Sequence, residues 1–216
     1  MAKQRCGPGF FGKLPSHSDF ITRRVPSALL APWEAWLEAG LQHSREFFGD
    51  AWLEAYLSSP IWSFCGSAGC CGDRPFCGVL MPSQDRIGRY YPLSIMTRLC
   101  AGASPFDIAI SATEWFEQME ALALSCLREG FDFATFDARL AAVPVPSAGA
   151  KTAASADAPY PEIYRTAEFG GLLSRLLERA AVGYSLWWTS ESQTSAARFY
   201  AYQGLPPMAE FARFLG

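Results

Sequence analysis

The spacing of hydrophobic residues predicts two helices near the start of the chain. Between residues 31 and 48, apolar side chains recur every three or four positions, as on one face of a helix, and Gly49 follows the last turn. A second, shorter helix is expected after Asp50, whose side chain can cap it, and Pro60 ends it. Residues 7–13, which precede both helices, are rich in glycine, and we expect a rigid turn there.

A different pattern follows between residues 61 and 99. Short runs of aromatic and β-branched residues alternate with glycine and proline, which is typical of strands in a sheet. We expect these strands at residues 61–65, 76–81 and 90–97. The helical period then returns in two segments, at residues 111–129 and 132–142.

The C-terminal third of the chain combines a polar loop, helices and two strands. Residues 144–159 are small, polar and low in complexity, so we expect a mobile surface loop. Helical spacing at residues 168–181 is followed by strands at residues 184–188 and 198–202 and by a terminal helix at residues 207–215. The whole pattern predicts a single α/β domain over residues 1–216, in which helices pack on the faces of a mixed β-sheet.

Composition excludes several classes of protein. Half of the 216 residues are hydrophobic, which is enough for a sizeable core and excludes a disordered chain. The net charge is −3, and no run of lysine or arginine exceeds the pair Arg23-Arg24, so we expect no nucleic-acid binding. No segment is apolar enough for insertion into a membrane or for a secretory signal, so we expect a cytoplasmic location.

Two nucleotide-binding patterns overlap in the sequence GPGFFGK at residues 7–13. It satisfies both G-x-G-x-x-G and G-x-x-x-x-G-K. A phosphate-binding loop also needs a buried strand before it, a helix after it, and Ser or Thr after the lysine. Only six mainly polar residues precede Gly7, Leu14 follows Lys13, and Pro15 disfavours a helix at this point. We therefore expect no nucleotide cofactor here.

Ser16, His17 and Asp19 contain the residue types of a serine hydrolase. Hydrolase triads bring these groups together from separate parts of a fold, and the nucleophile motif G-x-S-x-G does not occur in this chain. We interpret the segment as a turn whose side chains bond to the local backbone.

Four of the seven cysteines, at positions 65, 70, 71 and 77, lie close together in sequence. They have no C-x-x-C spacing and no nearby histidine, so small buried thiols are favoured over a zinc site. An odd number of cysteines in a chain of this length also argues against a disulfide framework. No metal and no catalytic residue are expected.

Residues 79–93 predict a strand, a polar connection and a second strand. The connection places Asp85, Arg86 and Arg89 between two apolar runs. The planar guanidinium group of arginine can bind a carboxylate or backbone carbonyls. These charged residues either fix the hairpin internally or contact a partner, and the sequence leaves both alternatives open.

The glycine-rich and the charged segments together resemble a known family. The matching residues are GFFGKLP at 9–15, Asp19-Phe20, Arg23, PW at 32–33, WL at 36–37, SPIW at 59–62, GVLMPS at 78–83, Asp85-Arg86, GRY at 88–90, PL at 92–93, LWW at 186–188 and GLP at 204–206. With these residues the chain resembles the TagF (ImpM) family of type VI secretion system-associated proteins. It departs from that pattern at Ser18, where glycine is expected, and a serine there is strained if the position needs a positive φ.

The resemblance implies a cytoplasmic accessory protein, not an enzyme, that represses the type VI secretion system after translation. Family members are associated with the forkhead-associated scaffold protein of that system, which is therefore the implied partner. The residues that we expect to contact it are Lys13, Asp19, Arg23, Asp85, Arg86 and Arg89. Two alternatives stay open. One is a small hydrolase or metal-dependent enzyme that uses His17 with Asp19, or the cysteines at 65–77, and the other is a structural subunit of the secretion machine.

Overall fold

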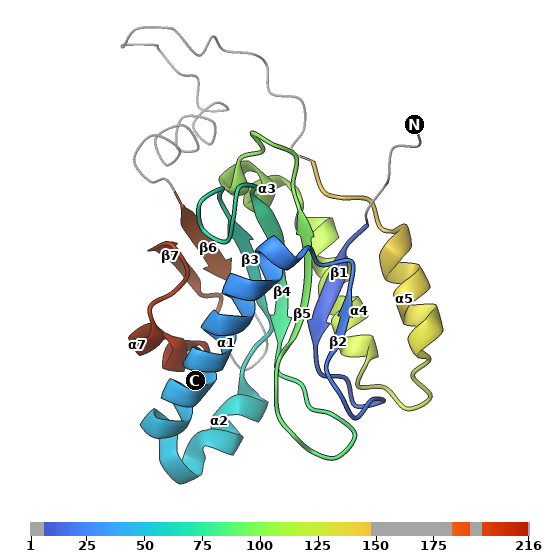
Figure 1. Cartoon of the computed structure of the whole chain (residues 1–216), viewed down its shortest axis with the longest axis vertical. Coiled ribbons are helices and arrows are strands. Elements are labelled where there is room, and N and C mark those ends of the chain that lie inside the picture. The colour runs from blue at the N-terminus through green and yellow to red at the C-terminus, as the bar shows by residue number, and fades with distance from the viewer. Residues whose placement is uncertain (1–6, 148–182, 191–195, 216) are drawn as a thin grey trace, which may run out of the picture.

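The chain folds into a seven-stranded sheet with helices on both faces (Figure 1). The computed structural model describes residues 7–147, 183–190 and 196–215. The strands are β1 (Gly9–Gly12), β2 (Ile21–Arg23), β3 (Trp62–Gly66), β4 (Phe76–Met81), β5 (Leu93–Arg98), β6 (Tyr184–Trp188) and β7 (Phe199–Gln203). The helices are α1 (Ser27–Phe48), α2 (Trp52–Ser58), α3 (Pro105–Ser111), α4 (Thr113–Ser125), α5 (Phe133–Ala142) and α7 (Met208–Phe211), with 3-10 turns at Gly49–Ala51 and Ala212–Phe214. The expected layered α/β fold is confirmed.

The strands lie in the order β2-β1-β5-β4-β3-β6-β7. Every strand pair in the described part of the chain is antiparallel, so the sheet is antiparallel there and not mixed in direction. Loops without a helix join β1 to β2, β3 to β4 and β4 to β5, and such connections return the chain in the opposite direction. Parallel neighbours would need long crossover segments between consecutive strands.

Both faces of the sheet are buried, each under its own layer of helices. Helices α1, α2 and α7 cover one face and form an aromatic core, while α3, α4 and α5 cover the other (Figure 1). Neighbouring residues of a strand point to opposite faces, so Ile95 joins the α4 side and Met96 joins the α1 side. On the α1 side, Trp33 stacks on Trp187 with ring centroids 5.7 Å apart, and its indole N–H donates to Ser94 Oγ at 2.9 Å.

Residues 9–12 form strand β1, so the rigid turn expected for this segment was wrong. The strand lies between β2 and β5, with both Phe10 and Phe11 buried. Gly12 has a φ of +135°, and a Cβ atom built on it would lie 2.1 Å from the carbonyl oxygen of Pro92. Glycine serves here for the close approach of two backbones, a role that composition alone does not distinguish from a turn.

Most of the other expected elements are present, with different boundaries. Helix α1 begins at Ser27, earlier than residue 31, the expected helix at 111–129 corresponds to α4, and α3 before it was not predicted. The side chain of Ser104 caps α3, and that of Asp132 caps α5. The expected helix at 168–181 lies outside the described residues, as does the expected loop at 144–159 from residue 148 onward. None of the described helices is both long and apolar enough to cross a membrane.

Candidate functional site

The connection between β4 and β5 is organised around the carboxylate of Asp85, which is buried. Its Oδ1 accepts hydrogen bonds from the backbone amides of Ile87 and Arg89, at 3.1 and 2.9 Å. Its Oδ2 accepts from Nε of Arg89 at 2.6 Å and lies 3.0 Å from Nζ of Lys13, whose side chain is also buried. Gly88, with a φ of +84°, allows the tight turn between these amides. The carboxylate of Asp85 thus holds the backbone of this turn through its amides.

Two opposing effects act on the pKa of Asp85. Burial is the larger single effect and by itself would raise the pKa above the ordinary value of 3.8. The hydrogen bonds from the backbone and guanidinium of Arg89, from Lys13 and from the amide of Ile87 together outweigh burial and hold the pKa well below its usual range. Asp85 is therefore ionised near neutral pH, and it neutralises one of the two cations that it binds.

Hydrogen bonds also tie this connection to the segment that follows β1. The backbone amide of Arg86 donates to the carbonyl of His17 at 2.9 Å, and the guanidinium of Arg89 donates to the carbonyl of Ser18. The two segments are about 70 positions apart in the chain. We call Lys13, Asp85 and Arg89, together with the backbone that they hold, the Asp85 unit.

A buried serine and tyrosine extend this unit to helix α2. The hydroxyl of Ser83 donates to the carbonyl of Lys13 at 2.7 Å. The hydroxyl of Tyr56 in turn donates to the carbonyl of Ser83 at 2.8 Å and accepts from its amide at 2.9 Å. Burial is the main cause that raises the pKa of Tyr56, so this phenol stays protonated and can keep both bonds.

Four of the six residues that the sequence singled out come together in the structure. Lys13 and Arg89 bind Asp85 directly, whereas Asp19 is exposed and its Oδ1 lies 3.9 Å from the guanidinium of Arg89. Of the two alternatives for the charged residues, the structure shows the first, because Asp85 fixes the hairpin internally. The side chain of Arg89 is 53% exposed, so its outer edge stays open to a partner.

The other two of these residues lie apart from Asp85. The side chain of Arg86 is exposed, and no hydrogen bond or ion pair holds it within the described residues. The guanidinium of Arg23 lies over the ring of Phe133, 5.7 Å from its centroid, on the α5 side of the sheet. A role in partner binding stays a prediction for all six residues.

The backbone strain considered for Ser18 occurs instead at Arg24. Among the described non-glycine residues, Arg24 has a positive φ, of 55°, and Ser18 does not. The guanidinium of Arg24 lies 2.6 Å from Asp137 Oδ1 and donates to the carbonyl of Pro8 at 3.0 Å. These contacts between β2, β1 and α5 hold an uncommon backbone conformation in place.

The arrangement of Ser16, His17 and Asp19 differs from that of a hydrolase triad. His17 Nδ1 lies 2.8 Å from Ser16 Oγ, and its ring packs on Phe133 with centroids 4.6 Å apart. Asp19 instead faces Arg89, and within the described part of the chain no carboxylate bonds to His17. A triad needs an acid that orients the histidine, so this segment does not supply one.

The cysteines at 65–77 belong to the core. Cys65 and Cys77 are opposite each other on β3 and β4 and are fully buried. Burial is the main cause that raises the pKa of the Cys65 thiol. Across residues 7–147, 183–190 and 196–215, no three His, Cys, Asp or Glu side chains are grouped so that they could hold a metal ion.

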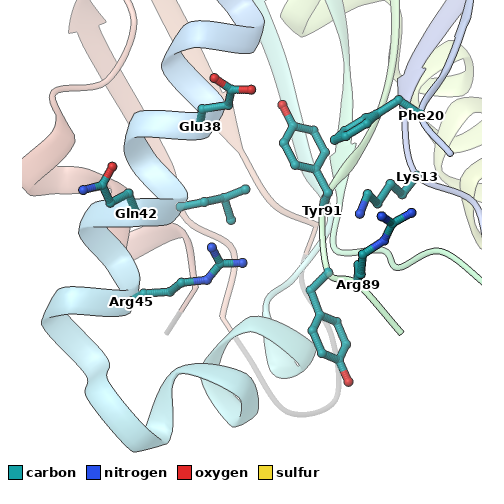
Figure 2. A pocket seen from close by; sticks show the side chains of 9 residues that line it. Lys13, Phe20, Glu38, Gln42, Arg45, Arg89 and Tyr91 are labelled. Atoms are coloured by element: carbon teal, nitrogen blue, oxygen red, sulfur yellow. The ribbon is translucent and has the colours of Figure 1, made fainter. Parts of the chain in front are cut away.

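A pocket of about 700 Å³ opens beside the Asp85 unit, between α1 and the connection from β4 to β5. Three cationic side chains line it: Lys13, Arg45 and Arg89. Three aromatic side chains line it as well: Phe20, Tyr90 and Tyr91. Figure 2 shows Glu38, Gln42 and Arg45 projecting from α1 on one side, with Lys13, Arg89, Phe20 and Tyr91 on the other. We name this feature the cationic pocket.

Reasoning from the sequence missed most of the cationic pocket. One signal was available, because Glu38, Gln42 and Arg45 are spaced by four and three positions and therefore share one face of α1. These residues are polar, and a polar face of a helix ordinarily points to solvent. What the sequence could not show is that the β4–β5 connection stands opposite this helical face.

Comparisons with known proteins identify the family of the chain. The model of the TagF N-terminal domain, described as type VI secretion system-associated, matches residues 9–143. A search of curated proteins gave no match. The crystal structure of PA0076 from Pseudomonas aeruginosa PAO1 is similar, with a TM-score of 0.83 and 38% sequence identity over 96% of this chain and 93% of that one. The matched residues include β1, the Asp85 unit and the whole cationic pocket, and the chain belongs to the TagF family of type VI secretion system-associated proteins.

Proposed function

We propose that this protein is a cytoplasmic regulator that represses the type VI secretion system after translation by binding one of its components. The component that we propose is the forkhead-associated scaffold protein. Membership of a family associated with this secretion system supports the proposal. The protein acts by recognition and not by catalysis, since the charged residues beside the pocket are engaged in structural contacts and form no catalytic arrangement.

The observation that carries the proposal is the exposed tip of a rigid hairpin. Ile87 is 64% exposed and stands in the sequence between Arg86 and Arg89, whose side chains are also exposed, while Phe20, which lines the pocket with Arg89, is 49% exposed. The buried bonds of Asp85 hold the backbone under this tip. A partner therefore meets apolar and cationic groups whose backbone is already ordered, which reduces the entropy lost on binding.

More apolar surface lies at the same end of the molecule. Phe47, near the C-terminal end of α1, is 68% exposed, and Leu53 and Leu57 of α2 are also exposed. Figure 1 shows that this end of α1, helix α2 and the β4–β5 connection lie together at one end of the structure. Exposed apolar side chains that gather around charged ones are typical of surfaces that bind proteins.

Deletion of the gene tests this function in a strain whose secretion system is assembled but silent. We expect secretion of the tube protein to rise on deletion and to fall again when the wild-type gene is restored. The double variant Arg86→Ala, Ile87→Ser should restore less repression, because both side chains are exposed and their loss leaves the Asp85 unit intact. Arg128→Ala changes an exposed arginine elsewhere and should restore it fully.

Unchanged secretion after deletion would remove the repressor role. A structural subunit gives the opposite phenotype, because its deletion abolishes secretion and the protein co-purifies with assembled particles. A repressor is expected in the soluble fraction with free scaffold protein. Particle fractionation in the same strains therefore separates the two functions.

A further inference from the structure

The cationic pocket contains a hydrogen-bond donor that the described residues leave unused. The side chain of Tyr91 is 6% exposed, and its hydroxyl has no hydrogen-bond partner among the described residues. Aromatic rings hold it in place, with Phe20 and Phe11 edge-on at 4.7 and 5.8 Å. Figure 2 shows the hydroxyl end of Tyr91 between Glu38 and Phe20. A buried hydroxyl without a partner is unfavourable, and an acceptor from a bound molecule would relieve this.

Burial, followed by the nearby charges of Glu34 and Glu38, raises the pKa of Tyr91. The phenol therefore stays protonated near neutral pH and can donate. An acceptor on a bound molecule complements this donor.

Arg45 supplies a cation on the opposite side of the same pocket. Its guanidinium lies over the ring of Trp52, 4.5 Å from the centroid, which fixes its position. No carboxylate lies within ion-pair distance of it in the part of the chain that the structure describes. Figure 2 shows the group directed toward the pocket. Stacking on an aromatic ring leaves the edge of a guanidinium free to bind an anion.

The charges around the cationic pocket favour one monovalent anion. Lys13 and Arg89 share the single carboxylate of Asp85, so that unit keeps one positive charge, and Arg45 adds another. Glu38 is the one carboxylate that lines the pocket itself, and Asp19 stands outside it beside Arg89. Glu38 offsets part of these two positive charges, so a group with a single negative charge matches the pocket better than a more highly charged one.

We propose that the cationic pocket binds the carboxylate of an aspartate or glutamate side chain that a partner protein presents on a loop next to an apolar residue. The carboxylate lies between Arg45 and Arg89 and accepts from Tyr91 once the half-exposed Phe20 ring moves aside. The apolar neighbour packs on Phe20 and Tyr90. The assignment of this partner as the scaffold protein rests on the proposed function, whereas the carboxylate chemistry rests on the pocket.

The first arm of the test measures binding of the purified scaffold protein by calorimetry. Arg45→Gln and Tyr91→Phe should each weaken binding about tenfold, since a charged hydrogen bond is lost. Tyr91→Phe should leave the thermal midpoint of unfolding unchanged, because its hydroxyl has no hydrogen-bond partner among the described residues, and Arg45→Gln should lower it only slightly, through the lost stacking on Trp52. Glu38→Gln should strengthen binding a few-fold, and Arg128→Gln should match the wild type. Wild-type affinity in both Arg45→Gln and Tyr91→Phe would overturn the proposal.

The second arm does not depend on the scaffold protein. Butyrate, as a free monocarboxylate, is titrated into isotope-labelled protein and followed by NMR, with inorganic phosphate as a second probe. Saturable shifts at the Nε–H of Arg45 and at the amides of residues 89–91, lost in Arg45→Gln, support the carboxylate assignment. Shifts spread over other surface arginines, or a response to phosphate without one to butyrate, overturn it. If the wild type does not bind the scaffold protein, the proposed partner is wrong and this arm alone decides the pocket's chemistry.

Discussion

Arg89 binds Asp85 through two separate donors. The backbone amide of Arg89 donates to Asp85 Oδ1 at 2.9 Å, and its Nε donates to Oδ2 at 2.6 Å. The same guanidinium donates outward to the carbonyl of Ser18, and about half of the side chain remains exposed. The hairpin can therefore be fixed and still offer a surface to a partner, because Nε of Arg89 binds Asp85 while about half of the side chain is exposed.

Arg89→Ala should lower the free energy of unfolding by about 1 kcal/mol, and Arg86→Ala should leave it unchanged. Arg89 loses charged hydrogen bonds, but solvent screening at a half-exposed site and the remaining bond from Lys13 limit the loss. Arg86 has an exposed side chain and contributes to the hairpin through its backbone amide. Urea denaturation of the two variants measures the difference. Equal losses would mean that the Asp85 unit does not depend on the Arg89 side chain.

The low pKa of Asp85 makes part of the stability dependent on pH. The folded protein holds this carboxyl ionised below the unfolded pKa of about 3.8, so the unfolded chain binds more protons in acid. The contribution is therefore fully present above that value and is lost as the pH falls from about 4 toward the lower pKa of the folded state. Asp85→Asn should lower the thermal midpoint at pH 7, and its difference from the wild type should shrink at pH 3. A constant difference across this range would contradict the assignment.

The sequence predicted the individual helices and strands better than the contacts between them. The helical period was sufficient to find α1 and α5, and β-branched and aromatic runs were sufficient for β3 and β4. Strand β1 was missed because glycine is common in turns and depleted in strands, and no local pattern shows the close strand packing that requires its two glycines. Lys13, Asp85 and Arg89 were identified because charges stand out between apolar runs. Arg45 and Tyr91 were missed because their role depends on contacts across about 50 positions of the chain, which no local pattern encodes.

Two buried tyrosines near the Asp85 unit should respond differently to the loss of a hydroxyl. Tyr56→Phe removes both bonds to the backbone of Ser83, and the unpaired amide left behind should cost about 1 to 3 kcal/mol of stability. Tyr91→Phe removes a hydroxyl without a partner among the described residues, so the free energy of unfolding should stay the same or rise slightly. The two changes are chemically identical, and chemical denaturation of both variants compares the two environments. A similar loss in both would show that Tyr91 has a structural bond.

A last pair of variants tests whether the packing of β1 requires glycine at position 12. Gly12→Ala would place a methyl group 2.1 Å from the carbonyl oxygen of Pro92, at a φ of +135°. Gly102 also has a positive φ, of 76°, but nothing lies within 4 Å of an added Cβ there. Gly102→Ala should therefore cost only the backbone penalty of about 1 to 2 kcal/mol, while Gly12→Ala should cost clearly more because β1 must move away from β5. Thermal unfolding of both variants measures the gap. If the two lose the same stability, the close approach of β1 and β5 is not what requires glycine at position 12.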